Sequence, residues 1–388
     1  MVVSGVVCEY NPFHNGHRYM LDCMRKDGAT HIIGIMSGNF VQRGEPAICD
    51  KYLRAENAVR NGADLIIELP LPYAVGTAET FARGSVGLLD KLKCIDRLYF
   101  GSESGIDELK ACLDEAESPE FEGKIKVYLK EGLSYPTAFS KALNNPVADT
   151  PNNVLALEYM KQLKTMNSRI TPCSILRKGV QHDSSEAVGS FLSASAIREG
   201  LREGKDVDLF MPENTVEKMK IALESGEMPA DVKNLELAIL SKLRSMTAED
   251  FSRIADVNEG LEYRLEKAVS QATSLDELHN LILTKRYTNA KIRRIILSAF
   301  LGVTKEMQSE IPDYINVLAC NGNGIDIIRR IKESSDITVI TKHSESESLS
   351  NRDRKLYDFT ERCDDQFGLT LPEIRKCGYN REHKFEVI

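Results

Sequence analysis

The sequence predicts an α/β fold of the doubly wound type, in which helices cover both faces of a parallel sheet, followed by a mostly helical region. Two observations lead to this prediction. Over about the first 200 residues, continuous runs of Val, Ile and Leu alternate with amphipathic helical patterns, as expected for strands that are buried on both faces. After about residue 205, helical patterns follow one another directly. We therefore predict one domain over residues 1–204 and a mostly helical region over residues 205–388.

The first region contains four predicted strands with helices between them. Crossovers between parallel strands are right-handed, so the carboxyl ends of the strands meet at one edge of the sheet, where ligands of such folds bind. The predicted strands cover residues 3–10, 30–38, 63–70 and 95–103, and the predicted helices cover residues 15–26, 50–62 and 78–92.

The second region has apolar residues at three- and four-residue spacing, which predicts helices. A short strand–helix–strand insert is expected at about residues 313–342, and the polar tail from Ser344 is expected to be helical or irregular. The four predicted helices before the insert cover residues 213–225, 235–246, 261–272 and 275–286.

The composition excludes several classes of protein. With 42% hydrophobic and 28% charged residues the chain is globular, and its net charge of −8 means that nucleic acid would have to bind at a local basic patch. The nine cysteines form no CxxC pair, so we expect free thiols and no zinc site of that kind. No apolar run approaches the length of a membrane helix, which takes about 20 residues, so a cytoplasmic protein is expected.

A motif with chemical potential, His14-Asn15-Gly16-His17, lies between the first predicted strand and the first predicted helix. The unpaired N–H groups and the dipole at a helix start favour an anion such as phosphate, and a glycine there lets a nucleotide approach the backbone. Two imidazoles can donate hydrogen bonds to charge that develops on a phosphate during displacement. The motif therefore indicates nucleotidyl transfer, with His14 and His17 as catalytic residues. Zinc fits less well, because no third ligand lies nearby.

A second motif, "FLSASAIREG" at residues 191–200, opens another predicted helix. Ser193, Ser195 and Arg198 are candidates for binding the β- and γ-phosphates, although Ser193 taken alone would be an ordinary helix cap. The combination of the two motifs is more specific than either one.

A basic segment lies in the second region, where no Asp or Glu occurs from Leu278 to Lys305. Ile292, Ile295, Ile296 and Ala299 share one helical face and are expected to be buried, so that Lys291 and Arg294 would point toward solvent. The segment is a candidate RNA surface, with Tyr287 able to stack on a base. Its candidate tRNA-binding residues are Lys285, Arg286, Lys291, Arg293 and Arg294.

The stretches "CEYNPFHNGH", "MSGNFVQRGEPA", "GADLIIELP", "FGSE", "PNN" and "SASAIR" occur in this order over residues 1–200, and "TKRYTNAKIRRI" follows at 284–295. Together they resemble the bacterial tRNA(Met) cytidine acetate ligase family, within the HIGH-type nucleotidyltransferase superfamily. The resemblance implies a Rossmann-like, HUP-type domain that forms acetyl-adenylate from ATP and acetate, releases pyrophosphate, and acetylates the wobble cytidine of elongator tRNA(Met) to N4-acetylcytidine.

The resemblance also implies the residues that contact ATP. "RKGVQHDS" at 177–184 departs from the family pattern around His182, whereas Arg177 matches. ATP enters as a substrate, and Mg²⁺ is compatible with the reaction although no sequence feature identifies a metal site. The implied ATP contacts are Val7, Cys8, Glu9, Tyr10, Asn11, Pro12, Phe13, His14, Asn15, Gly16, His17, Arg18, Tyr19, Met20, Gly101, Asn152 and Arg177.

Two other functions remain open from the residues themselves. A small-molecule adenylyltransferase would use the same HxGH chemistry to join AMP to a phosphorylated metabolite, but it would need little of the helical region. A binding protein for nucleotide or RNA without catalysis is the second alternative, and the presence of both histidines argues against it.

Overall fold

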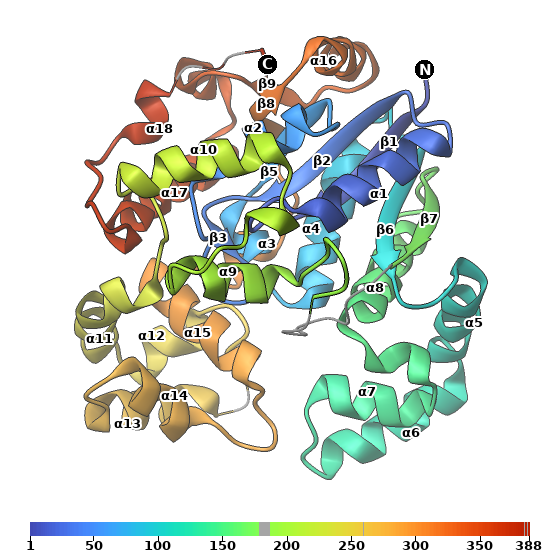
Figure 1. Cartoon of the computed structure of the whole chain (residues 1–388). Helices are drawn as coiled ribbons and strands as arrows, with labels where there is room; N and C mark the ends of the chain where they lie inside the picture. Colours follow the sequence, from blue (N-terminus) through green and yellow to red (C-terminus); the bar gives the residue numbers. More distant parts are fainter. Residues whose placement is uncertain (178–186, 259, 384, 386) are drawn as a thin grey trace.

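The computed structural model describes the whole chain except residues 178–186, 259, 384 and 386 (Figure 1). Its centre is a sheet of seven strands in the order β7-β6-β1-β2-β5-β8-β9. The first five strands in this order are parallel, whereas β8 runs antiparallel to β5 and β9 is parallel to β8. The strands are β1 Val3–Cys8, β2 His31–Ser37, β5 Leu65–Leu69, β6 Arg97–Ser102, β7 Thr171–Leu176, β8 Tyr314–Cys320 and β9 Thr338–Ile340, and a separate hairpin pairs β3 Phe40–Val41 with β4 Glu45–Pro46.

The alternation of side chains along the strands divides the core between the two faces of the sheet. In β2, Ile33 and Ile35 are buried against α4, α8 and α16 (Gly322–Ser334) on one face, while Ile32 and Met36 are buried against α1 and α2 on the other. Both sets are fully buried, which explains why the strand sequences are continuously apolar. The helices of the first 204 residues are α1 Asn15–Lys26, α2 Lys51–Arg60, α3 Leu71–Ala74, α4 Ala78–Lys91, α5 Ile106–Ala116, α6 Pro119–Lys130, α7 Tyr135–Leu143, α8 Pro151–Thr165 and α9 Ala194–Arg202.

A second hydrophobic cluster holds the helical region together and joins it to the sheet domain. Helices α11 to α15 supply most of it, and Phe40 of the hairpin packs among them with Leu71 of α3 (Figure 1). The remaining helices are α10 Glu213–Glu224, α11 Glu236–Arg244, α12 Ala248–Arg253, α13 Leu261–Gln271, α14 Leu275–Ile282, α15 Asn289–Leu301, α16 Gly322–Ser334, α17 Asn351–Phe367 and α18 Tyr379–Glu382, with short 3-10 turns at Pro146–Asp149, Asp208–Phe210, Val232–Leu235, Glu306–Gln308, His343–Ser348 and Gly368–Thr370.

The predicted α/β fold with a helical C-terminal region is confirmed, with one topological difference. The strand–helix–strand segment expected at 313–342 is present as β8, α16 and β9, but its strands extend the sheet of the first 200 residues. Because β8 is antiparallel, the sheet is mostly and not entirely parallel. The sheet is therefore built from both ends of the chain.

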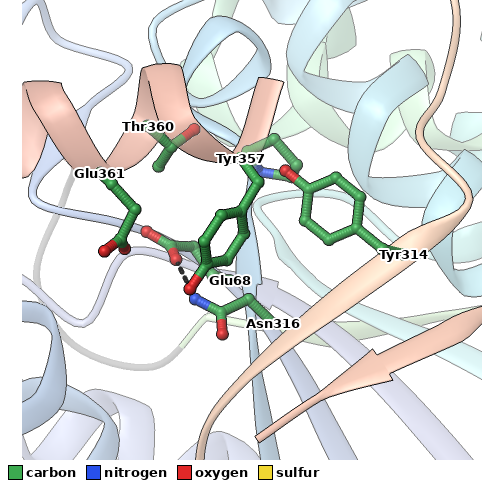
Figure 2. Close-up of a pocket in the computed structure, with 7 residues that line it drawn as sticks. Glu68, Tyr314, Asn316, Tyr357, Thr360 and Glu361 are labelled. Carbon is green, nitrogen blue, oxygen red and sulfur yellow. Dashed lines mark hydrogen bonds between the residues drawn. The ribbon is translucent and has the colours of Figure 1, made fainter. Parts of the chain in front are cut away.

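A buried charged cluster fixes the polar tail to the sheet. Lys51, at the start of α2, is fully buried, and its ammonium group bonds Glu68 of β5 at 2.9 Å and Asp364 of α17 at 2.6 Å. Glu361, which precedes Asp364 by about one turn of α17, lies over a small cavity between that helix and β8, close to Glu68 and Asn316 (Figure 2). The tail is thus helical as expected, but α17 buries charged residues against the sheet.

Candidate functional site

The HxGH motif closes the turn between β1 and α1. His14 is the N-cap residue of α1, and its Nδ1 accepts a hydrogen bond of 3.0 Å from the Gly16 backbone N–H. In return, the His17 Nδ1 accepts a 3.3 Å bond from the His14 backbone N–H. The two imidazoles therefore form a capping box, and each neutral ring carries its proton on Nε2. A Cβ on residue 16 would lie 2.9 Å from the His14 ring, so the motif requires glycine for space.

The two histidines are neutral. Their rings stack at 3.7 Å between centroids. Burial, followed by the charges of Arg177 and Arg198, lowers the pKa of His14 to about 3, and burial together with His14 holds the pKa of His17 well below its ordinary value. The expectation that the histidines donate hydrogen bonds is compatible with Nε2–H groups, but the expectation that they supply positive charge is wrong. That charge comes from the arginines.

The second motif meets the first at the same place. Ser193 is the N-cap of α9: its hydroxyl accepts a bond from the Ala196 N–H and lies 3.1 Å from the Ser195 hydroxyl. Arg198 is 4% exposed and donates to the carbonyl oxygen of Asn11 at 2.8 Å. Two helix N-termini that are about 180 residues apart in the chain therefore face one pocket.

The other end of the pocket is formed by β6, β7 and α8. Gly101 and Arg177 lie at the carboxyl ends of β6 and β7. The side chain of Asn152 donates to Glu103 at 2.5 Å, and Asn153 accepts a bond from the Glu103 N–H at 2.9 Å. Thr150 is the N-cap of α8, so neither asparagine serves as its cap.

The resulting pocket has a volume of about 310 Å³ at the carboxyl ends of β1, β6 and β7. The strand order changes direction between β1 and β6, which is where ligands bind in doubly wound sheets. Most of the residues proposed for ATP line it, but Pro12, Phe13, Asn15 and Arg18 do not. The predicted residues that line it are Val7, Cys8, Glu9, Tyr10, Asn11, His14, Gly16, His17, Tyr19, Met20, Gly101, Asn152, Arg177, Ser193, Ser195 and Arg198.

Sequence reasoning missed two groups of pocket residues. Gln42 and Arg43 belong to the hairpin after β2, inside the stretch "MSGNFVQRGEPA", and their position after a predicted strand was a usable signal. The aromatic wall had no such signal, because its members read as ordinary core residues. The other missed residues are Val6, Phe81, Phe100, Leu155, Tyr159, Ile175, Leu176, Phe191 and Ala194.

The basic segment lies next to this hairpin. The apolar face of α15 is buried as predicted. A Cβ on Gly44, between β3 and β4, would lie 2.5 Å from the backbone nitrogen of Arg294, so the hairpin and α15 touch through their backbones. The prediction that Lys291 and Arg294 point toward solvent is wrong, because both pair with Asp256, at 3.0 and 3.4 Å.

The candidate tRNA residues therefore fall into two groups. Lys285, Arg286 and Arg293 are exposed, whereas Lys291 and Arg294 are held between Asp256 and the hairpin.

Other features of the chain bear on the site. Within the described residues, no cluster of three or more His, Cys, Asp or Glu side chains is placed to hold a metal ion. All nine cysteines are free. Among the helices that the structure describes, none is long and apolar enough to cross a membrane. His182 lies outside the described residues.

Comparisons with known proteins agree with this geometry. Residues 1–382 match the family model of HIGH nucleotidyl transferases. The tRNA(Met) cytidine acetate ligase of Thermoanaerobacter sp. (strain X514) is 40% identical, covering 90% of this chain and 91% of the relative, and that of Halothermothrix orenii is 37% identical, covering 100% and 99%. A crystal structure of apo Thermotoga maritima TmcAL superposes with a TM-score of 0.93 at 30% identity over the whole of both chains. The same protein bound with alpha-thio ATP gives a TM-score of 0.89 at 30% identity, over 99% of this chain and 97% of that one.

Proposed function

This chain belongs to the tRNA(Met) cytidine acetate ligase family of HIGH nucleotidyltransferases, and we propose that it is an ATP-dependent ligase that acetylates tRNA. It joins acetate to AMP with release of pyrophosphate, then transfers the acetyl group to the N4 amine of the wobble cytidine in elongator tRNA(Met), in the cytoplasm. The observation that carries this proposal is the meeting of the HxGH and SASAIR motifs at one pocket.

ATP binds with its phosphates at the N-termini of α1 and α9. The two Nε2–H groups of His14 and His17 donate to the α-phosphate, on which negative charge develops when acetate attacks. Arg198 and the hydroxyls of Ser193 and Ser195 bind the departing phosphates. The adenosine then lies toward Gly101, Asn152 and the aromatic wall, at the ends of β6 and α8.

Residues 205–388 provide the surface for tRNA in this proposal. The basic face of α15 with the preceding loop adjoins the hairpin that carries Arg43 into the pocket, so an RNA bound at Lys285, Arg286 and Arg293 would lie close to the pocket mouth. This arrangement favours the tRNA ligase over a small-molecule adenylyltransferase, which has no use for such a surface. The unpaired bases of an anticodon loop enter a pocket at low cost.

ATP–pyrophosphate exchange tests the proposal. We expect exchange with acetate, little exchange with phosphorylated metabolites or without an acceptor, and acetylation of tRNA(Met) transcripts when ATP and acetate are both present. Exchange that depends on a phosphorylated metabolite and not on acetate would instead establish an adenylyltransferase. Absence of any exchange from a folded protein that still binds ATP would indicate a binding protein without catalysis.

A further inference from the structure

Glu9 is the first residue after β1, and its side chain lines the pocket beside the HxGH motif. Its carboxylate accepts a 2.9 Å hydrogen bond from the Gln42 backbone N–H, and its carbonyl oxygen accepts one of 2.5 Å from the buried guanidinium of Arg54. The residue is thus held both at its backbone and at its side chain. Such double anchoring fixes the carboxylate in the pocket.

Glu9 is the only carboxylate among the described residues that line the pocket. Acetate and ATP are both anions, so a negative charge there opposes the binding of the two substrates of the first step. The second step is different, because its incoming group is a neutral amine. A fixed carboxylate suits an amine, and carboxylates accept hydrogen bonds from the N4 amino group of cytosine.

The second step also requires a proton acceptor. The pKa values of His14 and His17 are held low, and guanidinium groups carry no acceptor. Burial raises the pKa of the Cys8 thiol and the Tyr159 hydroxyl, so both keep their protons. Burial also raises the pKa of Glu9, against the lowering effect of the Gln42 N–H, Arg198 and Arg43, while Glu45 adds to the rise. A carboxylate in this environment is a stronger base than one in water.

We propose that Glu9 accepts a hydrogen bond from the N4 amine of the target cytidine and acts as the general base of acetyl transfer. The nitrogen lone pair attacks the carbonyl carbon of acetyl-adenylate, and the new N–C bond forms as the bond from that carbon to the phosphate oxygen breaks. AMP departs with the electron pair, and the proton lost by the amine moves to the carboxylate of Glu9. This assignment rests on the proposed acetate ligase function.

The test separates the two steps. In Glu9→Gln the side-chain oxygen still accepts the bond from the Gln42 N–H, so the shape of the loop is retained while the base is removed. Acetate-dependent ATP–pyrophosphate exchange reports the first step. Single-turnover transfer of radiolabelled acetyl from the adenylate formed in the active site to tRNA(Met) reports the second. We expect transfer to fall by about 100-fold or more beyond any change in exchange. Glu9→Asp, which retains a carboxylate, should recover part of the loss.

The pH dependence gives a second readout. Transfer by the unmodified protein should rise with pH until Glu9 is ionised and then level off, and this rise should be absent from Glu9→Gln. Equal losses in exchange and transfer would overturn the proposal and place Glu9 in the ATP step, where it could coordinate a magnesium ion carried by the nucleotide. Unchanged transfer in Glu9→Gln would also overturn it. Failure of the proposed function has a different result, since the unmodified protein would then show no acetate-dependent exchange.

Discussion

Replacement of Glu361 by glutamine should make the protein more stable at alkaline pH. Glu361 is 7% exposed and belongs to a cluster in which Lys51 is surrounded by the carboxyl groups of Glu68, Glu361 and Asp364. Burial, and then the neighbouring carboxylates, raise its pKa from 4.5 to about 7, although Lys51 and Asn380 act in the opposite direction. The folded protein therefore holds a proton at this site over a pH range in which the unfolded chain has lost it.

The sign and size of the effect follow from proton linkage. Between pH 4.5 and about 7 the folded state binds more protons than the unfolded state, so the free energy of unfolding falls as pH rises. At about 1.4 kcal/mol per pH unit, this range corresponds to a loss of about 3 kcal/mol. Glutamine is neutral at every pH and still accepts the 2.9 Å hydrogen bond from Asn380. Glu361→Gln should therefore match the unmodified protein near pH 5 and exceed it by up to about 3 kcal/mol at pH 8.

Urea unfolding followed by circular dichroism at intervals from pH 5 to pH 8.5 measures this difference. Glu333→Gln, which removes an exposed carboxylate near the end of α16, is the matched control and should show a difference that does not change with pH. His343, 3.9 Å from Glu361, cannot produce the same trend. Its pKa is lowered, so its own effect is a stability that rises with pH. A constant difference between Glu361→Gln and the unmodified protein would refute the reasoning.

Three further changes test the pocket and the surface beside it. His17→Ala removes one Nε2–H donor and one half of the capping box, so acetate-dependent exchange should fall by about 100- to 1,000-fold, and melting curves should show that the protein remains folded. Lys285→Ala combined with Arg293→Ala should weaken tRNA binding and flatten the slope of log K against log salt by about one for each phosphate that the variant no longer binds, whereas an unchanged slope would exclude this surface. Gly44→Ala should destabilise the protein by at least about 2 kcal/mol in urea, since it combines a positive φ of 77° with a backbone clash against α15; Gly132→Ala, with a φ of 82° and open space around it, measures the strain alone and should cost less.

Sequence patterns predict the parts of this molecule that depend on local contacts. The first helix is predicted over residues 15–26 and is found as Asn15–Lys26, because its cap and its apolar face lie within a few residues of each other. The pairing of the HxGH and SASAIR motifs is predictable because each motif lies at a helix start, and helix starts bind anions wherever they come together. The family resemblance is confirmed by the relatives.

The features that the sequence does not predict depend on partners far away in the chain. The pairing of β8 with β5 joins residues as distant as Ile67 and Val317, and nothing in the apolar run of either strand specifies the other. Arg294 is expected to face solvent because no acidic residue lies near it in its own helix. Its partner, Asp256, lies 38 residues earlier, beyond the reach of helical periodicity. The neutrality of His14 likewise comes from burial and from Arg177 and Arg198, which only the folded chain brings close.

The charge of the whole chain is a poor guide to what the pocket binds. The chain carries a net charge of −8, whereas the described residues that line the pocket include three arginines and one carboxylate, giving 3 − 1 = +2 with neutral histidines. At physiological ionic strength charges are screened beyond about 8 Å, so most of the acidic surface contributes little at the pocket while the arginines act at contact distance. Arg43 also stands on the hairpin that touches α15. The positive charge of the pocket is therefore continuous with the exposed cations of the helical region, and an RNA that follows this path from Arg293 would reach the one group in the pocket, Glu9, that repels phosphate and accepts an amine.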